Sequence, residues 1–340
     1  MPSEAGPPAE VPEPVLGGVE VPRGDDVAPV TFIGGTGRSG THVLARLLSR
    51  NERMAQIPVE VRFHTDDDGF PGLLAGEVTL ERFMKRLRGF WWKGRQRTRM
   101  RGMFRFVDRE RFDAAAERFE RTFEDERELA CRRLFYDLLA FRADERDDGR
   151  GIVEQSTDTV AQAETLVRIF PEARFIHVVR DGRDASASRV AQTRGLVRPR
   201  TRADGIAWWR ERIEAIERGA NAIPPGRLLT VSLDEMLRIR RTRVALRPLF
   251  RFCGAHVSKA PRRYFNTHMN LDEANVERWR AGISKRKAER LDALYLEALA
   301  ELEAGGARCA PLLRHAYQRT SEPDLPPLIY VYDRNPDDES

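Results

Sequence analysis

The chain has 340 residues, 33 % of them charged, and a formal net charge of +5. This length suits one large α/β domain or two smaller ones, and no apolar run approaches the ~18 residues that span a bilayer. The basic residues are nearly all arginine. Such an excess reflects either a biased genome composition or bidentate recognition of phosphate or sulfate, and nothing in it requires nucleic acid.

Two features predict a cytoplasmic location. Residues 1–27 are acidic and rich in Pro and Gly, which is typical of a disordered tail and not of a signal peptide. Cys131, Cys253 and Cys309 are scattered, odd in number and without metal-ligand spacing, which suits a reducing compartment without disulfides or structural zinc. We expect no transmembrane segment and no metal requirement. Peripheral membrane contact stays open, and the sequence does not indicate the oligomeric state.

Short apolar strands and amphipathic helices alternate along the chain. A buried strand near 29–34 precedes a helix that ends near 51, and a short strand is expected within 54–63. Residues 78–145 predict a helical insert. Three strand–helix pairs then follow, at "GIVEQSTDTV" with "AQAETLVRIFP", at "ARFIHVVRD" with "RDASASRVAQTR", and at "RLLTVS" with "LDEML", and a further helix covers "GIAWWRERIEAIERG".

This alternation predicts an α/β fold with a central parallel sheet flanked by helices. We expect a single P-loop NTPase-like domain over residues 28–320. Residues 321–340 are expected to form an irregular tail, in which "LIYVY" could pack as a short strand.

The stretch "GGTGRSGTHVL" (34–44) predicts a loop that binds an anion. A Walker loop has Lys and Ser or Thr after its last glycine, whereas here Thr41 and His42 follow Gly40. The backbone amides of residues 37–41 and the helix N-terminus can still hold an anion, with Arg38, Ser39 and Thr41 as further donors. The loop therefore suits a nucleotide with a short 5′ anionic group, the alternative being a glycine-rich turn that binds nothing.

A second motif, "VVRDGRDASAS", places Arg180 at the end of the strongest predicted strand and Ser188 in the next helix. Ligands bind at the carboxyl ends of parallel strands, so these two side chains can clamp a second phosphate. The alternative is a structural ion-pair cluster, which is common at strand ends.

Together the two motifs resemble those of the PAPS-dependent sulfotransferases. "GGTGRSGTHVL" is similar to that family's 5′-phosphosulfate loop, and "RDGRDASAS" to its 3′-phosphate signature. "VSLDEML" and "VERWRAGIS" resemble the family's strand–acid–helix segment and its late Trp-centred segment. The resemblance covers roughly residues 29–300 and implies the sulfotransferase fold.

The resemblance also implies a reaction. The donor would be 3′-phosphoadenosine 5′-phosphosulfate (PAPS), and its sulfonate would pass in line to a hydroxyl of a small-molecule, glycan or lipid acceptor, leaving adenosine 3′,5′-bisphosphate. The alternatives are a P-loop kinase and a non-catalytic nucleotide-binding module. The residues expected to bind the donor are Gly37, Arg38, Ser39, Gly40, Thr41, His42, Arg180, Ser188, Arg278 and Arg280.

An acceptor hydroxyl must lose its proton, so a general base should face the sulfur. "IPVEVRFH" offers Glu60 and His64, and Glu60 matches the position of the glutamate base in several relatives. Arg38 is expected to support catalysis from the loop. The alternative for Glu60 is a surface carboxylate paired with Arg62.

The chain departs from the family pattern at two positions. Leu233 replaces the aromatic residue that commonly precedes the acid, and Gln155 stands where many relatives have a lysine. Arg38 or another arginine would then have to neutralise charge on the sulfonate.

The segment 89–106, "GFWWKGRQRTRMRGMFRF", combines basic and aromatic residues. It predicts a helical hairpin with buried aromatics, an acceptor-binding lid, or a surface for membrane or single-stranded nucleic acid.

Overall fold

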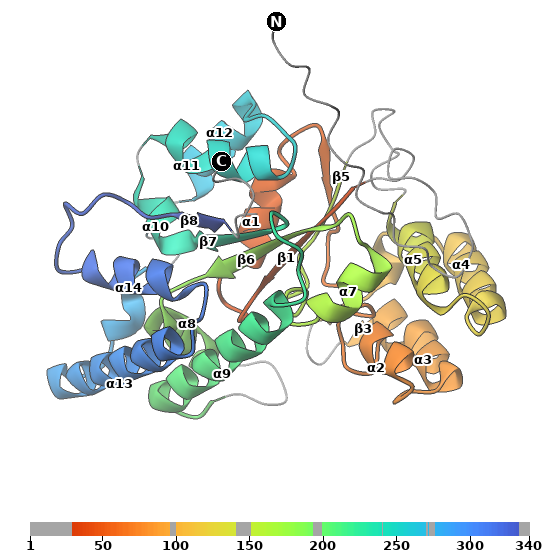
Figure 1. Ribbon diagram of the computed structural model, residues 1–340, viewed down its shortest axis with the longest axis horizontal. Coiled ribbons are helices and arrows are strands. Elements are labelled where there is room, and N and C mark those ends of the chain that lie inside the picture. Colours follow the sequence, from red (N-terminus) through yellow and green to blue (C-terminus); the bar gives the residue numbers. More distant parts are fainter. Residues whose placement is uncertain are drawn as a thin grey trace, which may run out of the picture.

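One six-stranded sheet organises the molecule, in the order β2, β5, β1, β6, β7, β8 (Figure 1). The strands are β1 Val30–Gly35, β2 Met54–Gln56, β5 Gly151–Glu154, β6 Arg174–Val179, β7 Leu228–Ser232 and β8 Tyr330–Tyr332. The computed structural model describes residues 29–95, 100–140, 151–192, 199–239, 241–269, 271 and 276–332. The predicted N-terminal tail lies outside these residues.

Strand pairing confirms the α/β fold and corrects it at one edge. The pairs β2–β5, β5–β1, β1–β6 and β6–β7 are parallel, whereas β8 runs antiparallel to β7. The sheet is therefore mixed, because β8 adds an edge strand after the last helix and needs no crossover. β8 lies within "LIYVY", the part of the predicted irregular C-terminal tail that could pack as a short strand, so this part belongs to the sheet. Residues 333–340 lie outside the described chain.

The strands bury both faces, as expected for a parallel sheet. Phe32 and Phe175 contribute to one hydrophobic cluster, whereas their neighbours Ile33 and Ile176 contribute to another. Successive side chains of a strand point to opposite faces, so each of these apolar runs supplies two cores.

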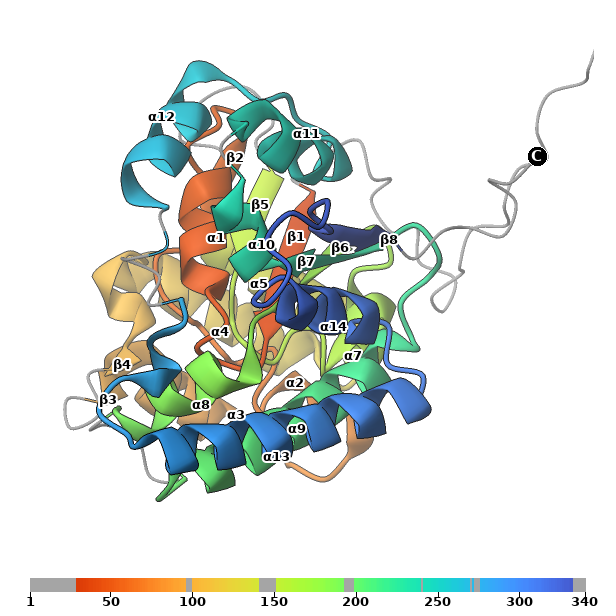
Figure 2. The ribbon, with the colours of Figure 1, turned by 90° about the vertical axis from the view of Figure 1, so that its left-hand side faces the viewer.

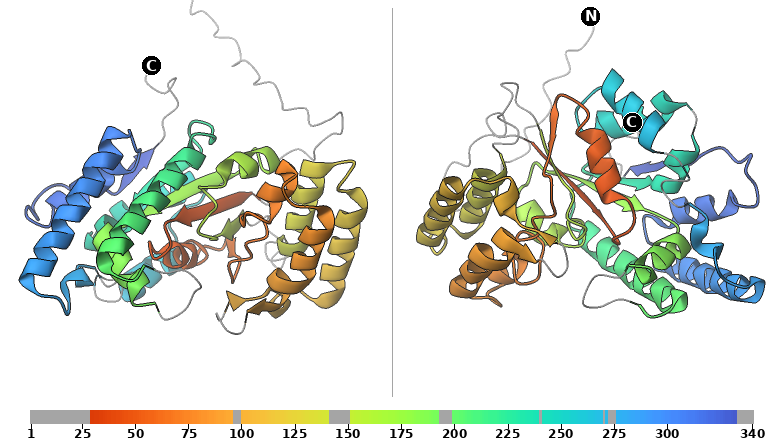
Figure 3. Two further views of the ribbon diagram at one scale, coloured as in Figure 1. Left: turned by 90° about the horizontal axis from the view of Figure 1, so that it is seen from below. Right: turned by 180° about the vertical axis from the view of Figure 1, so that it is seen from behind.

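Helices enclose the sheet in three groups (Figures 2 and 3). One face is covered by α1 (Thr41–Leu48), α10 (Leu233–Arg238), α11 (Thr242–Phe252) and α12 (Lys259–His268). The other face is covered by α7 (Ala163–Ile169) and the insert. A third cluster joins α8 (Gly182–Val190), α9 (Arg202–Ala220), the 3-10 turn η4 (Arg278–Arg280), α13 (Lys285–Ala304) and α14 (Ala310–Gln318).

The insert is mainly helical, as predicted, and packs beside one edge of the sheet (Figure 3). It follows α2 (Phe70–Ala75) and contains α3 (Leu80–Arg86), the π-helix η1 (Leu87–Trp91), the strands β3 (Gly94–Arg95) and β4 (Met100–Arg101), the 3-10 turn η3 (Met103–Arg105), α4 (Arg109–Thr122) and α5 (Arg127–Leu139).

Burial in the insert favours the core interpretation of its aromatic segment. Trp91 and Trp92 are buried, and the Trp91 indole N–H donates to Asp66 at 3.0 Å. Phe104 is exposed. The sequence predicted a helical hairpin here, but a short β-hairpin, β3–β4, takes its place, and residues 96–99 lie outside the described chain.

The sheet places two loops side by side. Gly35, the last residue of β1, pairs with Val178 near the end of β6. Because these strands are parallel neighbours, the loop 36–40 and the turn 180–181 leave the sheet at the same edge. β1 is also where the chain changes direction across the sheet, with β2 and β5 on one side and β6 and β7 on the other. Ligands of open α/β sheets bind at such a switch point.

Candidate active site

The loop after β1 has the backbone of an anion-binding turn. Gly37, Arg38 and Gly40 have φ values of 78°, 66° and 98°, a left-handed region that costs a residue with a Cβ strain. Among the described residues, the amides of 37–40 donate to no backbone carbonyl. Ser39 Oγ is buried without a hydrogen-bond partner there. Because buried polar groups normally have partners, these donors fit an anion held inside the loop.

Helix α1 begins directly after this loop. Its N-cap is Gly40, and no side chain caps it, so its first N–H groups and its dipole favour an anion at this end. A Cβ on Gly40 would lie 2.3 Å from Cδ2 of Leu233. Leu233 therefore packs against the loop itself, at the position where relatives commonly carry an aromatic ring.

The two predicted phosphate motifs meet in space. Arg38 Nε donates to Ser188 Oγ at 2.9 Å, and Arg180 Nη1 donates to the backbone oxygen of Arg38 at 3.3 Å. The structure thus brings together the loop, the end of β6 and α8.

Arg180 lies between two buried acids. Its Nε is 3.6 Å from Asp234 Oδ1, and its Nη2 is 4.0 Å from Asp184 Oδ2. Asp234 Oδ2 also accepts the backbone N–H of Asp181 at 2.8 Å. These contacts fix the Arg180 guanidinium at the end of β6. The segment is therefore also a structural ion-pair cluster, which was the alternative interpretation of this motif.

Positive charge accumulates where Arg38 lies. Burial lowers the pKa of Arg38 from its usual value, and the neighbouring charges of Arg180 and Arg189 lower it further. Burial also lowers the pKa of Arg189. A lowered pKa means that the charged form of each arginine is destabilised at this place. A bound anion would stabilise the charged forms of Arg38 and Arg189. Arg189 was not predicted from the sequence as a member of this cationic group. Its position directly after Ser188 could have indicated it.

The late Trp-centred segment is docked on α8 by its backbone. Asp184 accepts the N–H groups of Glu277 at 2.7 Å and Trp279 at 2.9 Å. Arg202 of α9 donates to the carbonyl oxygens of Trp279 and Ala281. The turn is therefore fixed beside the helix that carries Ser188.

The two arginines predicted on this turn differ from Trp279 in burial. Trp279 packs in the core over the guanidinium of Arg183, whereas Arg278 and Arg280 are exposed. The Arg280 guanidinium lies over the ring of Trp279. The role of these two arginines in binding the donor remains a prediction.

Glu60 lies next to the start of α1. Its Oε1 is 3.1 Å from His42 Nε2, and the two side chains are 26 % and 48 % exposed. The predicted surface pair with Arg62 is wrong, since Arg62 bonds Asp66. Glu60 is therefore held beside the loop by a residue of the loop helix. His42 in turn uses one ring nitrogen on Glu60 and is less available to a phosphate than predicted.

His64 lies elsewhere and is not part of this open surface. It is fully buried, its Nε2 is 3.0 Å from Glu154 Oε2, and its ring stacks near Phe32. The prediction of His64 as a base is corrected, because a base must reach the acceptor hydroxyl and this ring packs in the core.

Gln155 also does not reach the site. Its side-chain nitrogen donates to the carbonyl of Ile57 at 2.8 Å, and its oxygen accepts from Gln56 at 3.2 Å. It ties the end of β5 to the chain after β2.

A group of potential metal ligands lies apart from these residues. The ligand atoms of His177, Glu217 and Cys309 lie within 4.8 Å of one another. Burial lowers the pKa of His177 to about 4, so its ring is neutral. Glu217 is already bonded to the backbone N–H groups of Arg308 and Cys309. This group belongs to the packing of α9 against α14.

The fold and the site define a class. A mostly parallel sheet with a glycine-rich loop between β1 and α1, lacking the Walker lysine, describes a P-loop-like fold. The sulfotransferase family matches residues 29–259. The match covers more than half of the chain, and the chain therefore belongs to the sulfotransferase family.

Solved structures with related folds are distant in sequence. The sulfotransferase domain of the olefin synthase from Synechococcus PCC 7002 is 17 % identical, with a TM-score of 0.48, over 82 % of this chain and 96 % of that one. The sulfotransferase domain from the curacin biosynthetic pathway is 14 % identical, with a TM-score of 0.48 over 82 % and 98 %. Sulfotransferase STF9 from Mycobacterium avium is 14 % identical, with a TM-score of 0.41 over 81 % and 77 %. No curated protein sequence matches the chain.

Membership of the family makes the protein a transferase with an acceptor substrate. Among the helices that the structure describes, none is long and apolar enough to cross a membrane.

Proposed function

We propose that the protein transfers the sulfonate group of PAPS to a hydroxyl of a polar acceptor. The observation that carries this proposal is the hydrogen bond of Arg38 to Ser188, which joins the two motifs into one surface. A donor with a 5′-phosphosulfate and a 3′-phosphate has its anionic groups at two ends, and a site with two anion-binding centres suits it.

The loop would hold the 5′ end of the donor. The amides of residues 37–41 and the hydroxyls of Ser39 and Thr41 are donors aimed at the position where charge develops on the leaving 5′-phosphate. Ser39 Oγ supports this role because it is buried without a partner among the described residues. Arg38 adds the positive charge that the missing lysine would have supplied.

Arg180 and Ser188 would hold the 3′-phosphate, with Arg189 beside them. The donation from Arg38 to Ser188 leaves the Ser188 hydroxyl hydrogen available to an acceptor oxygen. These side chains would let the enzyme separate this donor from nucleotides that lack a 3′-phosphate.

Glu60 would act as the general base. Its carboxylate takes the proton from the acceptor hydroxyl while the hydroxyl oxygen attacks sulfur, the S–O bond to the 5′-phosphate breaks, and the electron pair leaves with that phosphate. His42 would position Glu60, since its ring bonds the carboxylate at 3.1 Å.

A polar cleft lined by Arg62 and by residues of α7 and α9 supports a polar acceptor. The cleft has a volume of about 460 Å³ and includes Arg62, two residues after Glu60, together with Asp67, Asp158 and Arg212. Pockets of this size take small molecules. Its charged lining favours a glycan or a small polar compound over a lipid tail.

The test is transfer of labelled sulfonate from PAPS to a panel of sugars and hydroxylated small molecules. Product formation that needs no added metal supports the proposal. The competing function is a P-loop kinase, and phosphate transfer from ATP with Mg²⁺ to the same panel would favour it.

A further inference from the structure

A second basic surface lies on α11 and α12, and the proposed function does not use it. Between residues 238 and 268 the sequence has no Asp or Glu. The same segment contains nine basic residues, namely Arg238, Arg240, Arg241, Arg243, Arg247, Arg251, Lys259, Arg262 and Arg263. Because the net charge of the whole chain is only +5, the rest of the chain is net negative. This segment therefore accounts for the net positive charge of the chain.

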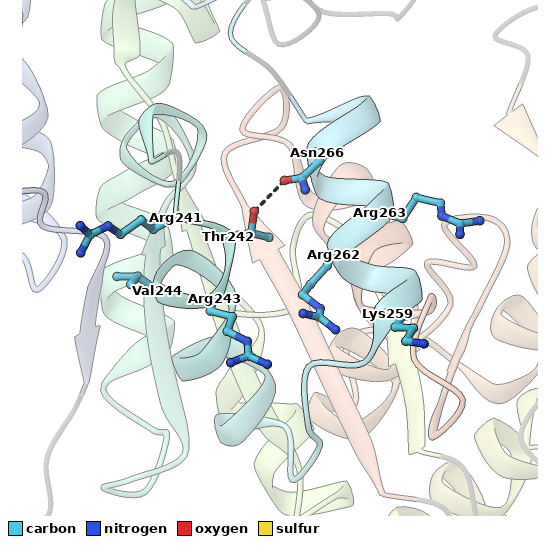
Figure 4. Close-up of a pocket in the computed structure, with 8 residues that line it drawn as sticks. All are labelled: Arg241, Thr242, Arg243, Val244, Lys259, Arg262, Arg263 and Asn266. Atoms are coloured by element: carbon cyan, nitrogen blue, oxygen red, sulfur yellow. Dashed lines mark hydrogen bonds between the residues drawn. The ribbon is translucent and has the colours of Figure 1, made fainter.

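The two helices form an open cleft of about 640 Å³ (Figure 4). Eight residues line it, and five of them are cations: Arg241, Thr242, Arg243, Val244, Lys259, Arg262, Arg263 and Asn266. The side chains of Arg243 from α11 and Arg262 from α12 reach toward the same space, with Lys259 beside them (Figure 4). No carboxylate is among the lining residues.

The cations of the cleft differ from the arginines of the protein that pair with carboxylates. Within the described chain, none of the five forms an ion pair, whereas Arg62, Arg132 and Arg183 each pair with a carboxylate. Two hydrogen bonds hold side chains of the cleft in place without neutralising the charge of its cations. Arg262 Nε donates to the carbonyl of Ser258 at 3.2 Å, and Thr242 Oγ1 donates to Asn266 Oδ1 at 2.6 Å. Unpaired like charges held together repel one another, so an anion bound between them would be stabilised.

We propose that the α11–α12 cleft binds a small soluble ligand with two or more phosphate groups. Guanidinium groups match phosphate oxygens in a bidentate way. A phosphate monoester carries close to two negative charges at neutral pH, and a ligand of several phosphates suits five cations better than singly charged sulfate esters. The cleft volume also lies in the range of small-molecule pockets.

Two other occupants fit the lining less well. None of the described lining residues is aromatic, so they offer no ring on which a nucleic-acid base could stack. Val244 is the one apolar side chain among them, too little apolar surface to insert into a bilayer.

The cleft is separate from the donor site. The loop 36–40 lies at the N-terminal end of α1. The segment before α12 lies at the opposite end of α1, where the Asn51 side chain donates to the carbonyl oxygen of His256. In Figure 2, α11 and α12 lie at the top of the molecule, and α8, which carries Ser188, lies in its lower half. A ligand in this cleft would therefore bind alongside the donor.

The test is calorimetric titration with inorganic tripolyphosphate at low salt, with adenosine 3′,5′-bisphosphate present at saturation to fill the donor site. We expect one further site in the wild type. The double variant Arg243→Gln/Arg262→Gln should weaken tripolyphosphate binding at least tenfold. Arg247→Gln is the matched control, because Arg247 is an exposed arginine of α11 outside the lining, and it should change the affinity less than threefold.

Circular dichroism verifies that the variants fold. Equal affinity of the wild type and the double variant would overturn the proposal, as would no binding by the wild type. Binding to vesicles of phosphatidylcholine and phosphatidylserine without binding to tripolyphosphate would also overturn it, in favour of a membrane surface. Since the variants lie outside the donor site, these outcomes do not depend on sulfonate transfer.

Discussion

Arg38 and Ser188, which are 150 residues apart in the sequence, are joined by a hydrogen bond of 2.9 Å. This contact ties the loop after β1 to helix α8. It brings the guanidinium of the loop beside the hydroxyl on α8 that we propose for the 3′-phosphate. The two distant motifs therefore form a single surface.

Ser188→Ala should lower the affinity for adenosine 3′,5′-bisphosphate by roughly threefold to tenfold, the size of one hydrogen bond of ~0.5–1.5 kcal/mol. The affinity for AMP should stay nearly the same, because AMP lacks the 3′-phosphate. Calorimetric titration measures both. An equal loss for the two nucleotides would mean that Ser188 does not read the 3′-phosphate.

Gly40→Ala should destabilise the protein more than Gly37→Ala. Both glycines have positive φ, but a Cβ at Gly37 meets nothing within 4 Å, whereas at Gly40 it lies 2.3 Å from Leu233 Cδ2. Gly37→Ala should cost about 1–2 kcal/mol of backbone strain, and Gly40→Ala more, as measured by denaturant unfolding.

A double-mutant cycle isolates the contact with Leu233. Leu233→Ala removes the clashing methyl group, so Gly40→Ala should cost less in that background than in the wild type. If Gly40→Ala costs the same in both backgrounds, Leu233 does not pack against the loop.

Asp184 should make the stability depend on pH. Burial, the strongest cause, and the charge of Asp181 raise the pKa of Asp184 to about 7, although Arg180 opposes the shift. The folded state then binds this proton more tightly than the unfolded state, whose pKa is near 3.8. The free energy of unfolding should therefore fall as pH rises from about 4 to about 7, by up to about 1.4 kcal/mol per pH unit.

Asp184→Asn removes this dependence while keeping the shape of the side chain. The wild type should lose stability relative to the variant between pH 4 and pH 7 in urea unfolding. Other groups that titrate in this range, such as His177, contribute to both proteins and cancel. A constant difference across the range would show that Asp184 has the same pKa in both states.

Glu60→Gln should lower the turnover number by about 10²–10⁴-fold, the usual contribution of a general base. Binding of adenosine 3′,5′-bisphosphate should not change, since Glu60 would act on the acceptor. His42→Ala should cost less, because the carboxylate would lose only its positioning partner. Unchanged turnover of Glu60→Gln with a true acceptor would refute the assignment.

The sequence predicted the strands that carry the site because their signals are local. Apolar runs ending in glycine or in Arg180 mark β1 and β6. The spacing from Arg180 to Ser188 also lay within one strand–helix unit. Such short-range patterns depend little on the rest of the fold.

Contacts between distant segments could not be predicted in the same way. The burial of His64 depends on Glu154, 90 residues away, and Glu60 is oriented by His42 from another element. The antiparallel β8 depends on the path of the chain after α14. Each of these follows from tertiary packing, which a single sequence does not reveal.

Calorimetric titration of the wild type with adenosine 3′,5′-bisphosphate and with AMP tests the central claim most directly. The site that Arg38, Arg180 and Ser188 form should bind the bisphosphate at least tenfold more tightly than AMP, without added metal. Equal affinity for the two nucleotides would contradict PAPS as the donor.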